Sequence, residues 1–487
     1  MDNKYKNFAD LAHSVGVEGV SDSGRPVVCV QGMGFVGVAM AVAVATARDA
    51  SGNLIYDVIG VDLANKDGQF KVDSVNTGSL PLTTTDPKLK SFFADAYAQK
   101  NFVATTDSAV FALADTVLVD VHLDVIDKDG VLDIAVDGFK AAIRTLAEHI
   151  SPETLVIIET TVPPGACEHI VAPELNAGFE KRGIAVDQLM LAHSYERVMP
   201  GDKYLDSIIN FWRVFSGYNQ AAGDKCEEFM TNVINIAEYP LTRLHSTNAS
   251  ETAKVLENSY RAMNIAFIEE WGQFAEAIDV DLFQVLDAIR YRPTHNNIRQ
   301  PGFGVGGYCL TKDPLFAKLA TEKLFGLPPM EFPFSVQAVK TNKKSPLVSL
   351  AKVEKELGGS IQGKKILLLG VSYRQDVGDT RYSPSEVFVN AAMEKGAQVV
   401  CQDPLVDTWP ELDMAISMEL GSALLEGVDA VVFAVPHKEY KDLDVVGWLN
   451  GASPIILDAN AVLSGAQRTQ IYNNKTPLYC IGRGTGL

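Results

Sequence analysis

The chain has 487 residues, of which 47% are hydrophobic and 21% are charged, and its formal net charge is −19 at pH 7. At roughly 100 to 200 residues per domain, this length predicts several domains. The acidic balance disfavours nucleic acid and anionic membranes as partners, because both attract basic surfaces.

The start of the chain lacks the apolar core of a secretory signal, and no apolar run reaches the roughly 18 residues of a membrane helix. We therefore expect a cytoplasmic protein. The cysteines show no CxxC spacing, which predicts neither a disulfide framework nor a metal site. The six cysteines are Cys29, Cys167, Cys226, Cys309, Cys401 and Cys480, and most of them are expected to be buried thiols.

A glycine-rich turn follows the first apolar run, PVVCVQGMGFVGVAMAVAVATA at 26–47. Strand, tight turn and helix in this order favour a pyrophosphate site, although a plain strand-helix turn is the alternative. A second strand ends in Asp62, which lies further along than usual because of a polar insertion, ARDASGN. An acidic residue there accepts from a ribose hydroxyl and repels a 2′-phosphate, so NAD is favoured over NADP. The predicted cofactor residues of this region are Gly32, Gly34, Phe35, Val36, Gly37 and Asp62.

Strand and helix patterns alternate in two series, separated by long amphipathic helices. Such alternation predicts parallel sheets with helices on both faces. The expected fold class is α/β, with two Rossmann-like, doubly wound sheet domains joined by a central helical domain. The expected divisions are an N-terminal extension (1–24), an NAD-binding domain (25–220), a central helical domain with the cysteine loop (221–345) and a C-terminal domain (346–487).

Polar residues recur on one face of the long helix predicted at 248–278. Lys254, Asn258 and Arg261 have the spacing i, i+4 and i+7, so they share that face. A solvated helix face is the plain alternative. A lysine and an amide beside a thiolate would instead stabilise an oxyanion.

The segment PGFGVGGYCLTKDP, at 301–314, places Cys309 behind glycine-rich backbone and before a helix expected to begin near Lys312. A helix N-terminus and a lysine both stabilise a thiolate, which favours a nucleophile over a buried structural thiol. The glycines permit close approach of a ligand, and Asp313 lies within one turn to take a proton.

Several segments together resemble the UDP-glucose/GDP-mannose dehydrogenase family, in the family's order and over nearly the whole chain. They are GMGFVG, ETTVPPG, SYERVMPG, ETAKVLENSYRAMNIAF, PGFGVGGYCLTKDP, GVSYRQDVGDTRYSPS and CQDP. The resemblance implies an NAD-binding domain, a central region that forms a homodimer or higher oligomer, and a nucleotide-sugar-binding domain. It also implies that the C6 alcohol of a UDP-sugar is oxidised to a carboxylate by two NAD.

The resemblance also implies roles for single residues. Cys309 would capture the intermediate aldehyde as a thiohemiacetal, and a second oxidation would give a thioester that water releases as uronic acid. Lys254 and Asn258 match an oxyanion-stabilising pair, and Asp313 matches a proton acceptor. The implied catalytic residues are Cys309, Lys254, Asn258 and Asp313, with Glu196 and Thr161 around an active-site water.

Basic positions complete the implied site. Arg381 resembles a cofactor contact and Arg374 a nucleotide contact, although either can instead pair with Asp376 or Asp379. In the family, an arginine ahead of the glycine loop reaches a neighbouring subunit's substrate, and the candidates here are Arg290, Arg292 and Arg299. The predicted substrate-binding residues are Arg197, Arg261, Arg299, Gly306, Gly307, Tyr373 and Arg374.

SYERVMPG and ENSYRAMNIAF are more similar to the branch that oxidises UDP-N-acetylhexosamines (ManNAc, GalNAc or GlcNAc) than to the UDP-glucose branch. Arg197 carries this distinction, unless it is only a salt-bridged or exposed side chain. The alternatives are a UDP-glucose 6-dehydrogenase, a two-electron 3-hydroxyacid-type dehydrogenase and a nucleotide-sugar-binding protein without turnover. The hydroxyacid reading leaves Cys309 and the second sheet unexplained.

Some positions depart from the family's pattern. VHLDV replaces a Val-Pro-Thr-Pro type loop, so Leu123 stands where a threonine commonly touches NAD. The nucleophile, lysine, asparagine and aspartate are all kept, so we expect an active enzyme. The other departures are Tyr195 before the active-site glutamate, Glu269 and Glu270 in place of an Asn-Glu pair, and Tyr308 before the nucleophile.

Overall fold

A computed structural model describes residues 3–128 and 131–484. The chain divides into two compact units. Unit 1 comprises residues 1–256 and 315–331, and unit 2 comprises 257–314 and 332–487. Within the described ranges, no helix is both long enough and apolar enough to cross a membrane.

Unit 1 is built on an eight-stranded sheet in the order β10-β9-β8-β7-β4-β1-β2-β3. The strands pair in parallel except for β8 and β9, which are antiparallel. The predicted parallel sheet is therefore confirmed, and the antiparallel pair at this edge is an addition that the sequence pattern did not show. The strands are β1 (Val27–Gln31), β2 (Asp57–Val61), β3 (Phe102–Thr105), β4 (Thr116–Val119), β7 (Leu155–Ile158), β8 (Leu191–Tyr195), β9 (Val214–Gly217) and β10 (Thr242–Arg243).

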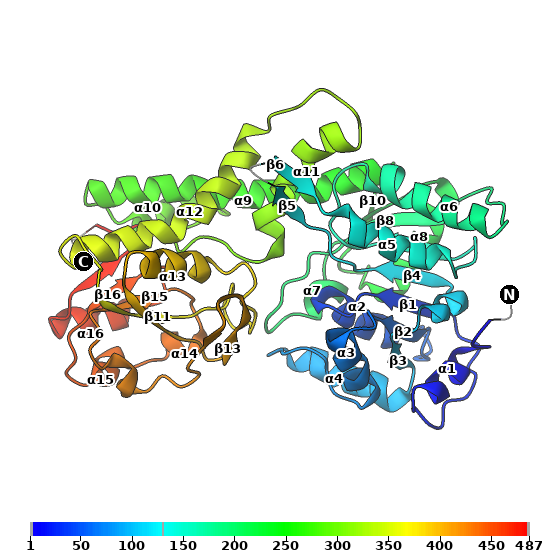
Figure 1. Ribbon diagram of the computed structural model, residues 1–487, viewed down its shortest axis with the longest axis horizontal. Helices are drawn as coiled ribbons and strands as arrows, with labels where there is room; N and C mark the ends of the chain where they lie inside the picture. Colours follow the sequence, from blue (N-terminus) through cyan, green and yellow to red (C-terminus); the bar gives the residue numbers. More distant parts are fainter. Residues whose placement is uncertain (1–2, 129–130, 485–487) are drawn as a thin grey trace. The chain divides into compact units, whose positions relative to one another are not determined.

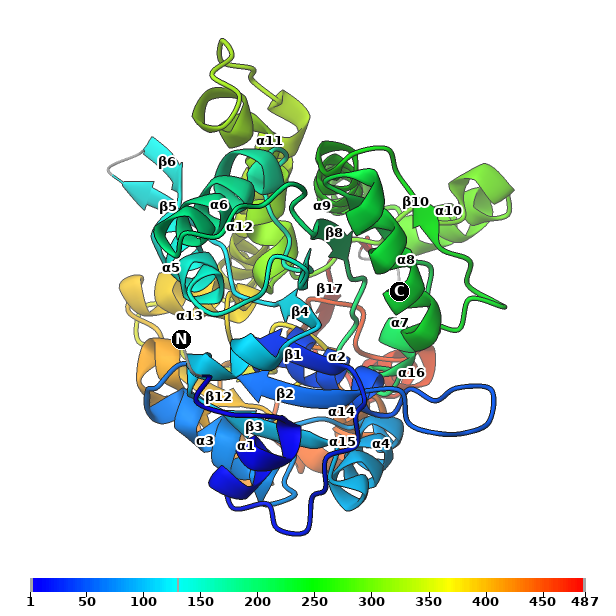
Figure 2. The same cartoon turned by 90° about the vertical axis from the view of Figure 1, so that its right-hand side faces the viewer.

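Helices cover both faces of this sheet, as predicted. Alternate strand residues, such as Val28 and Val30, form one buried cluster with the helices of the first face. Figure 2 shows α5 and α6 on the side of the sheet away from α7 and α8. The helices of the first face are α2 (Phe35–Ala45), α3 (Lys66–Asn76), α4 (Pro87–Gln99), α7 (Asp206–Ile209) and α8 (Gln220–Val233), and those of the second are α5 (Val136–Ala147) and α6 (Ala172–Lys181).

Unit 2 contains the second predicted sheet, which is parallel in the order β12-β11-β15-β16-β17. Leu368 faces one buried cluster and Leu367 the other, as expected for strands covered on both sides. Figure 1 shows α13 and α15 on opposite sides of the strands. The elements are β11 (Lys365–Leu369), β12 (Gln398–Gln402), β15 (Ala430–Phe433), β16 (Ile455–Asp458), β17 (Leu478–Cys480), α12 (Pro333–Glu356), α13 (Pro384–Glu394), α14 (Lys438–Lys441), α15 (Val445–Leu449) and α16 (Gly465–Asn473).

The long predicted helix is confirmed as α9 (Thr247–Ala277), which begins in unit 1 and ends in unit 2. Helix α11 (Tyr308–Lys323) begins at Tyr308 and not near Lys312, so Cys309 lies inside its first turn. The shorter elements are α1 (Phe8–Ser14), β5 (Val125–Lys128), β6 (Val131–Ile134), α10 (Leu282–Arg290), β13 (Thr408–Trp409), β14 (Met414–Ala415), the π-helical turn η2 (Cys167–Val171) and the 3-10 helices η1 (Ser108–Leu113), η3 (Pro293–His295), η4 (Pro410–Leu412) and η5 (Ser422–Leu425).

Candidate active site

The glycine turn after β1 forms a narrow cradle. Gly32 has a φ of +101°, and a Cβ on Gly37 would lie 1.9 Å from the Gly32 carbonyl oxygen. Gly34 is the N-cap of α2, and none of the described side chains caps this helix. Glycine backbone that leads into a helix N-terminus fits a pyrophosphate. The turn and the first turn of α2 contain the predicted residues Gly32, Gly34, Phe35, Val36 and Gly37.

Asp62 follows β2 and reaches back to this turn. Its Oδ2 accepts a hydrogen bond from Met33 N at 3.0 Å and lies 3.3 Å from Lys71 Nζ. The carboxylate therefore fixes the turn, and its contact with a ribose stays a prediction.

Three predicted catalytic residues lie in unit 1. Thr161 follows β7 and Glu196 follows β8, so both stand beyond the carboxyl ends of adjacent parallel strands. Lys254 is buried, and its Nζ donates to the backbone oxygen of Glu196 at 2.6 Å. Since Asn258 is buried as well, the alternative of a solvated helix face does not hold for these two residues, whereas Arg261 is exposed.

Sequence reasoning missed two buried acids and an arginine in the same part of unit 1. Glu159 Oε1 lies 3.2 Å from Arg213 Nη1, and both side chains are buried. Burial, with Glu159 and Glu196 nearby, raises the pKa of Asp120 well above its ordinary value. Glu159 is the first residue of the motif ETTVPPG, so the motif itself could have pointed to it as a site residue. Asp120 lies in no motif, and nothing in the sequence offered a comparable reason to select it.

Glu251 fixes the start of α9 and thereby Lys254. It accepts from Gly165 N at 2.6 Å and from Cys167 N at 2.8 Å, in the loop that follows Thr161. Burial raises the pKa of Glu251 to about 6 although these hydrogen bonds oppose the shift. This fully buried carboxylate joins the helix of Lys254 to the loop of Thr161.

The cysteine loop lies in unit 2, and Cys309 is exposed. The cysteines at the other five positions of the chain are buried, as predicted for most of them. Asp313 is fully buried on the same helix. Its Oδ1 accepts from Lys312 Nζ at 2.9 Å, and its Oδ2 accepts from Asn258 Nδ2 at 2.7 Å. Asn258 is thus hydrogen-bonded to Asp313, one helical turn after Cys309. Lys312, which the sequence indicated only as a charge near Cys309, is a second partner of Asp313.

Gly306 and Gly307 pack closely against the loop that carries Tyr373 and Tyr382. A Cβ on Gly307 would lie 2.9 Å from the ring of Tyr373, and one on Gly306 would lie 2.5 Å from the backbone oxygen of Tyr382. The contact of these glycines with a substrate stays a prediction. Burial, followed by the charge of Asp379, raises the pKa of Tyr373 to about 12, so its phenol keeps its proton.

Arg381 forms an ion pair with Asp379, which is one of the alternatives considered from the sequence. Its Nη2 lies 2.6 Å from Asp379 Oδ2, and its guanidinium lies 4.8 Å from the ring centroid of Tyr308. The guanidinium of Arg381 therefore packs against the ring of Tyr308, the residue directly before Cys309. Its predicted contact with the cofactor stays a prediction.

Arg374 lines a pocket of about 280 Å³ at the carboxyl edge of the second sheet. The pocket is bounded by the loops after β11, β15 and β16 and by the start of the glycine loop. Arg374 is exposed there. The lining residues are Phe303, Gly304, Ser372, Tyr373, Arg374, Gln375, Pro384, Ser385, Ala434, Val435, Pro436 and Asn460.

The Arg197 side chain is half-buried beside Tyr195. Its Nη1 donates to the backbone oxygen of Trp212 at 2.6 Å, and its guanidinium lies 5.2 Å from the ring centroid of Tyr195. Arg299 is exposed, while Arg290 donates to the backbone oxygen of Ile298. Substrate roles for these arginines stay predictions.

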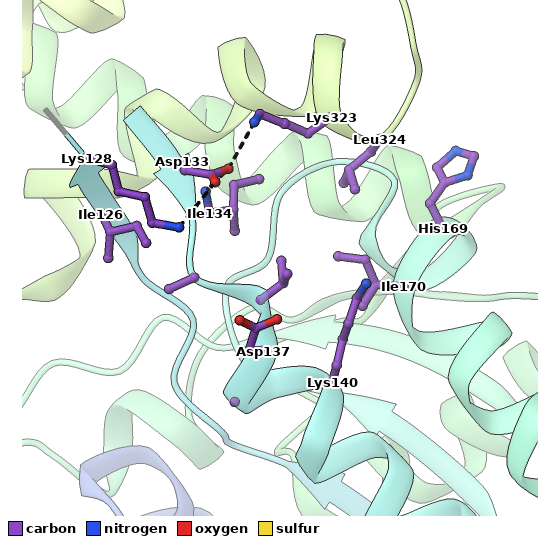
Figure 3. A pocket seen from close by; sticks show the side chains of 13 residues that line it. Ile126, Lys128, Asp133, Ile134, Asp137, Lys140, His169, Ile170, Lys323 and Leu324 are labelled. Atoms are coloured by element: carbon purple, nitrogen blue, oxygen red, sulfur yellow. Dashed lines mark hydrogen bonds and ion pairs between the residues drawn. The ribbon is translucent and has the colours of Figure 1, made fainter. Parts of the chain in front are cut away.

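Unit 1 also contains a pocket of about 620 Å³ beside the hairpin β5–β6 and the start of α5 (Figure 3). Asp133 lies between Lys323, at 3.2 Å, and Lys128, at 3.8 Å. Lys140 and His169 also line the pocket. Among the described lining residues, none is a predicted site residue, so this pocket is separate from the predicted groups.

Family models match the chain in three consecutive parts. The NAD binding domain of the UDP-glucose/GDP-mannose dehydrogenase family matches residues 27–234, its central domain 248–343 and its UDP binding domain 367–465.

The chain is also similar to individual proteins. It is 28% identical over 443 residues to a UDP-N-acetyl-D-mannosamine dehydrogenase of Methanocaldococcus jannaschii, covering 90% of this chain and 92% of that protein. It is 26% identical over 426 residues to an NDP-N-acetyl-D-galactosaminuronic acid dehydrogenase of Ralstonia nicotianae, covering 86% and 92%.

Two solved structures have similar folds. The NDP-N-acetyl-D-galactosaminuronic acid dehydrogenase of Methanosarcina mazei has a TM-score of 0.75 at 25% identity, covering 94% of this chain and 95% of that one. The UDP-D-ManNAc dehydrogenase of Pyrococcus horikoshii has a TM-score of 0.77 at 24% identity, covering 94% and 99%.

Proposed function

The chain belongs to the UDP-glucose/GDP-mannose dehydrogenase family and is an NAD-dependent nucleotide-sugar dehydrogenase, and we propose that Cys309 is the nucleophile with which it oxidises C6 of a UDP-N-acetylhexosamine. The supporting observation is the exposed thiol in the first turn of α11, one turn before the buried Asp313 and its partners Lys312 and Asn258. A helix N-terminus stabilises a thiolate.

The residues of unit 1 act on the alcohol and on the water. When bound, NAD supplies the hydride acceptor for each oxidation. Lys254 stabilises negative charge on the C6 oxygen as its proton leaves. Thr161 and Glu196 orient water for the last step, since both stand at the edge where β7 and β8 end.

Cys309 prevents loss of the intermediate. After the first hydride leaves C6, the thiolate adds to the aldehyde carbon and forms a thiohemiacetal. Loss of the second hydride and of the hydroxyl proton gives a thioester. Water then adds to the carbonyl carbon, the C–S bond breaks, and the carboxylate leaves with the thiolate restored.

Asn258 and Asp313 have complementary parts in this scheme. An amide carries two N–H donors, and one of those of Asn258 is given to Asp313. We assign the other to the substrate oxygen. Asp313 holds the amide in that orientation and accepts the proton of the attacking water.

The choice of sugar rests on the relatives' names and on Arg197. The similar proteins of M. jannaschii and R. nicotianae are named for N-acetylated sugars.

The assay that tests the choice of sugar is a panel of UDP-ManNAc, UDP-GalNAc, UDP-GlcNAc, UDP-glucose and GDP-mannose, scored by NADH absorbance. Turnover on an N-acetylated substrate at least tenfold above UDP-glucose supports the proposal, and preference for UDP-glucose overturns this part of it.

We further propose that two copies associate through α9. One face of this helix exposes large apolar side chains at helical spacing, including rings of Phe267 and Trp271 that contact each other. Light scattering should give a dimer or multiple of it, and Trp271→Glu should shift the mass towards the monomer. A monomeric wild type overturns this proposal. The exposed residues are Tyr260, Met263, Phe267, Trp271 and Phe274, and Ile278 follows directly after the helix.

A further inference from the structure

The first part of the loop after β11, residues 371–376, is held at both of its ends by one buried pair, Asp403 and His437. Both side chains are almost fully buried. Asp403 follows β12 and His437 follows β15, the two strands that flank β11. Their carboxyl ends meet at one edge of the sheet, so the three loops lie together there.

Asp403 holds the beginning of the loop. Its Oδ2 accepts from Val371 N at 2.8 Å, from Ser372 N at 3.0 Å and from Ser372 Oγ at 2.9 Å. Its Oδ1 accepts from Leu405 N at 3.0 Å. Burial opposes ionisation, but the hydrogen bonds from His437, Leu405 and Ser372 together hold the pKa of Asp403 below its ordinary value.

His437 holds the end of the loop. Its Nδ1 accepts from Asp376 N at 3.0 Å, which leaves the ring proton on Nε2, 3.2 Å from Asp403 Oδ2. Asp376 has a φ of +55°, a left-handed conformation that a non-glycine residue adopts only where its surroundings impose it. The imidazole therefore links the end of the loop to the carboxylate that holds its beginning.

The residues between these two ends are Tyr373, Arg374 and Gln375, and all of them line the pocket of about 280 Å³. We propose that Asp403 and His437 are positioning residues that present this segment to the nucleotide of the substrate. This rests on the proposed function, and the segment lies within residues 367–465, which match the UDP binding domain of the family. It also gives a role to the motif CQDP, which contains Asp403 and has no part in the chemistry at Cys309.

Two substitutions separate the two hydrogen bonds of His437. Asn places its carbonyl oxygen near the position of Nδ1, so His437→Asn keeps the acceptor for Asp376 N and loses the donor to Asp403. His437→Gln places its amide near Nε2 and does the reverse. Glu439→Gln, at an exposed position of the adjacent helix, is the control.

The experiment measures the Kd of UDP by calorimetry on the full chain, together with KM and kcat for the UDP-sugar and the Kd of NAD. His437→Gln should weaken UDP binding and raise KM by about fivefold to tenfold, the equivalent of one hydrogen bond, with kcat and NAD affinity kept. His437→Asn and the control should stay within about threefold. A variant that is merely misfolded would instead lose kcat at unchanged KM.

Equal UDP affinity of His437→Gln and wild type, or a loss in His437→Asn at least as large as in His437→Gln, overturns the positioning role alone. A wild-type chain that binds no UDP overturns the proposed function, and the positioning role with it.

Discussion

The side-chain amide of Asn258 donates to Asp313 Oδ2 at 2.7 Å, and both residues are buried. This contact joins the middle of α9 to the first turns of α11. Two buried polar residues that are far apart in sequence thereby satisfy part of each other's hydrogen-bonding capacity.

Replacing this amide by an acid should be costly. Asn258→Asp places two carboxyl groups at the distance of the present hydrogen bond, so one of them must keep a proton or the pair must separate. We expect urea unfolding to show a loss of about 2 kcal/mol at neutral pH, shrinking as the pH falls. Gln273→Glu makes the same change at an exposed position of α9 and should cost less than about 0.5 kcal/mol. Equal losses would contradict the burial argument.

Cys309 should be the one cysteine whose thiol reacts with an alkylating reagent in the native protein. Because the other cysteines are buried, native protein should take up one equivalent of iodoacetamide, and Cys309→Ser should take up none. Labelling should abolish uronic acid formation while the Kd of UDP changes by less than about threefold. Full oxidation by the labelled enzyme would remove Cys309 from the mechanism.

Lys254 should matter for turnover more than for binding. Lys254→Met removes the cation that contacts Glu196, so kcat should fall by about 100-fold or more while the Kd of NAD is unchanged. Lys225→Met, on the exposed face of α8, is the matched control. A change in KM at constant kcat would make Lys254 a binding residue.

The buried side chain of Glu269 should make the free energy of unfolding of the protein depend on pH. It accepts from Gly302 N at 2.9 Å, and burial raises its pKa to about 7. Below about pH 4.5 it is protonated in both the folded and the unfolded state and contributes nothing. As the pH rises towards 7 the unfolded state releases this proton first, so the free energy of unfolding falls, by up to the order of 3 kcal/mol.

Glu269→Gln keeps an acceptor for Gly302 N and removes that proton. Its melting temperature should therefore exceed that of wild type at pH 8 and equal it near pH 4.5. Glu270→Gln, an exposed neighbour, should change neither value. A gain of the same size at both pH values would mean that titration of Glu269 is not the cause.

Much of the fold could be predicted because buried strands and glycine turns leave local patterns. Both sheets, α9 and the turn at Gly32 were recognised this way. The strands β9 (VFSG) and β10 (TR) were missed because neither is a continuous apolar run, and β17 because Pro477 precedes a run of only three residues.

The contacts within the candidate site were harder to predict. Spacing placed Lys254 and Asn258 on one face, but only tertiary packing shows that Asn258 donates to Asp313. The pair Asp403 and His437 comes from strands that are neighbours in space and not in sequence. The close packing of Gly307 against the ring of Tyr373 likewise depends on a loop that is distant in the sequence.

The most direct test of the central claim counts NADH formed for each UDP-sugar consumed, in a reaction run to completion with excess NAD. Oxidation through a thioester on Cys309 predicts two NADH and one uronic acid per substrate. One NADH per substrate, with an aldehyde or ketone as the product, would contradict it.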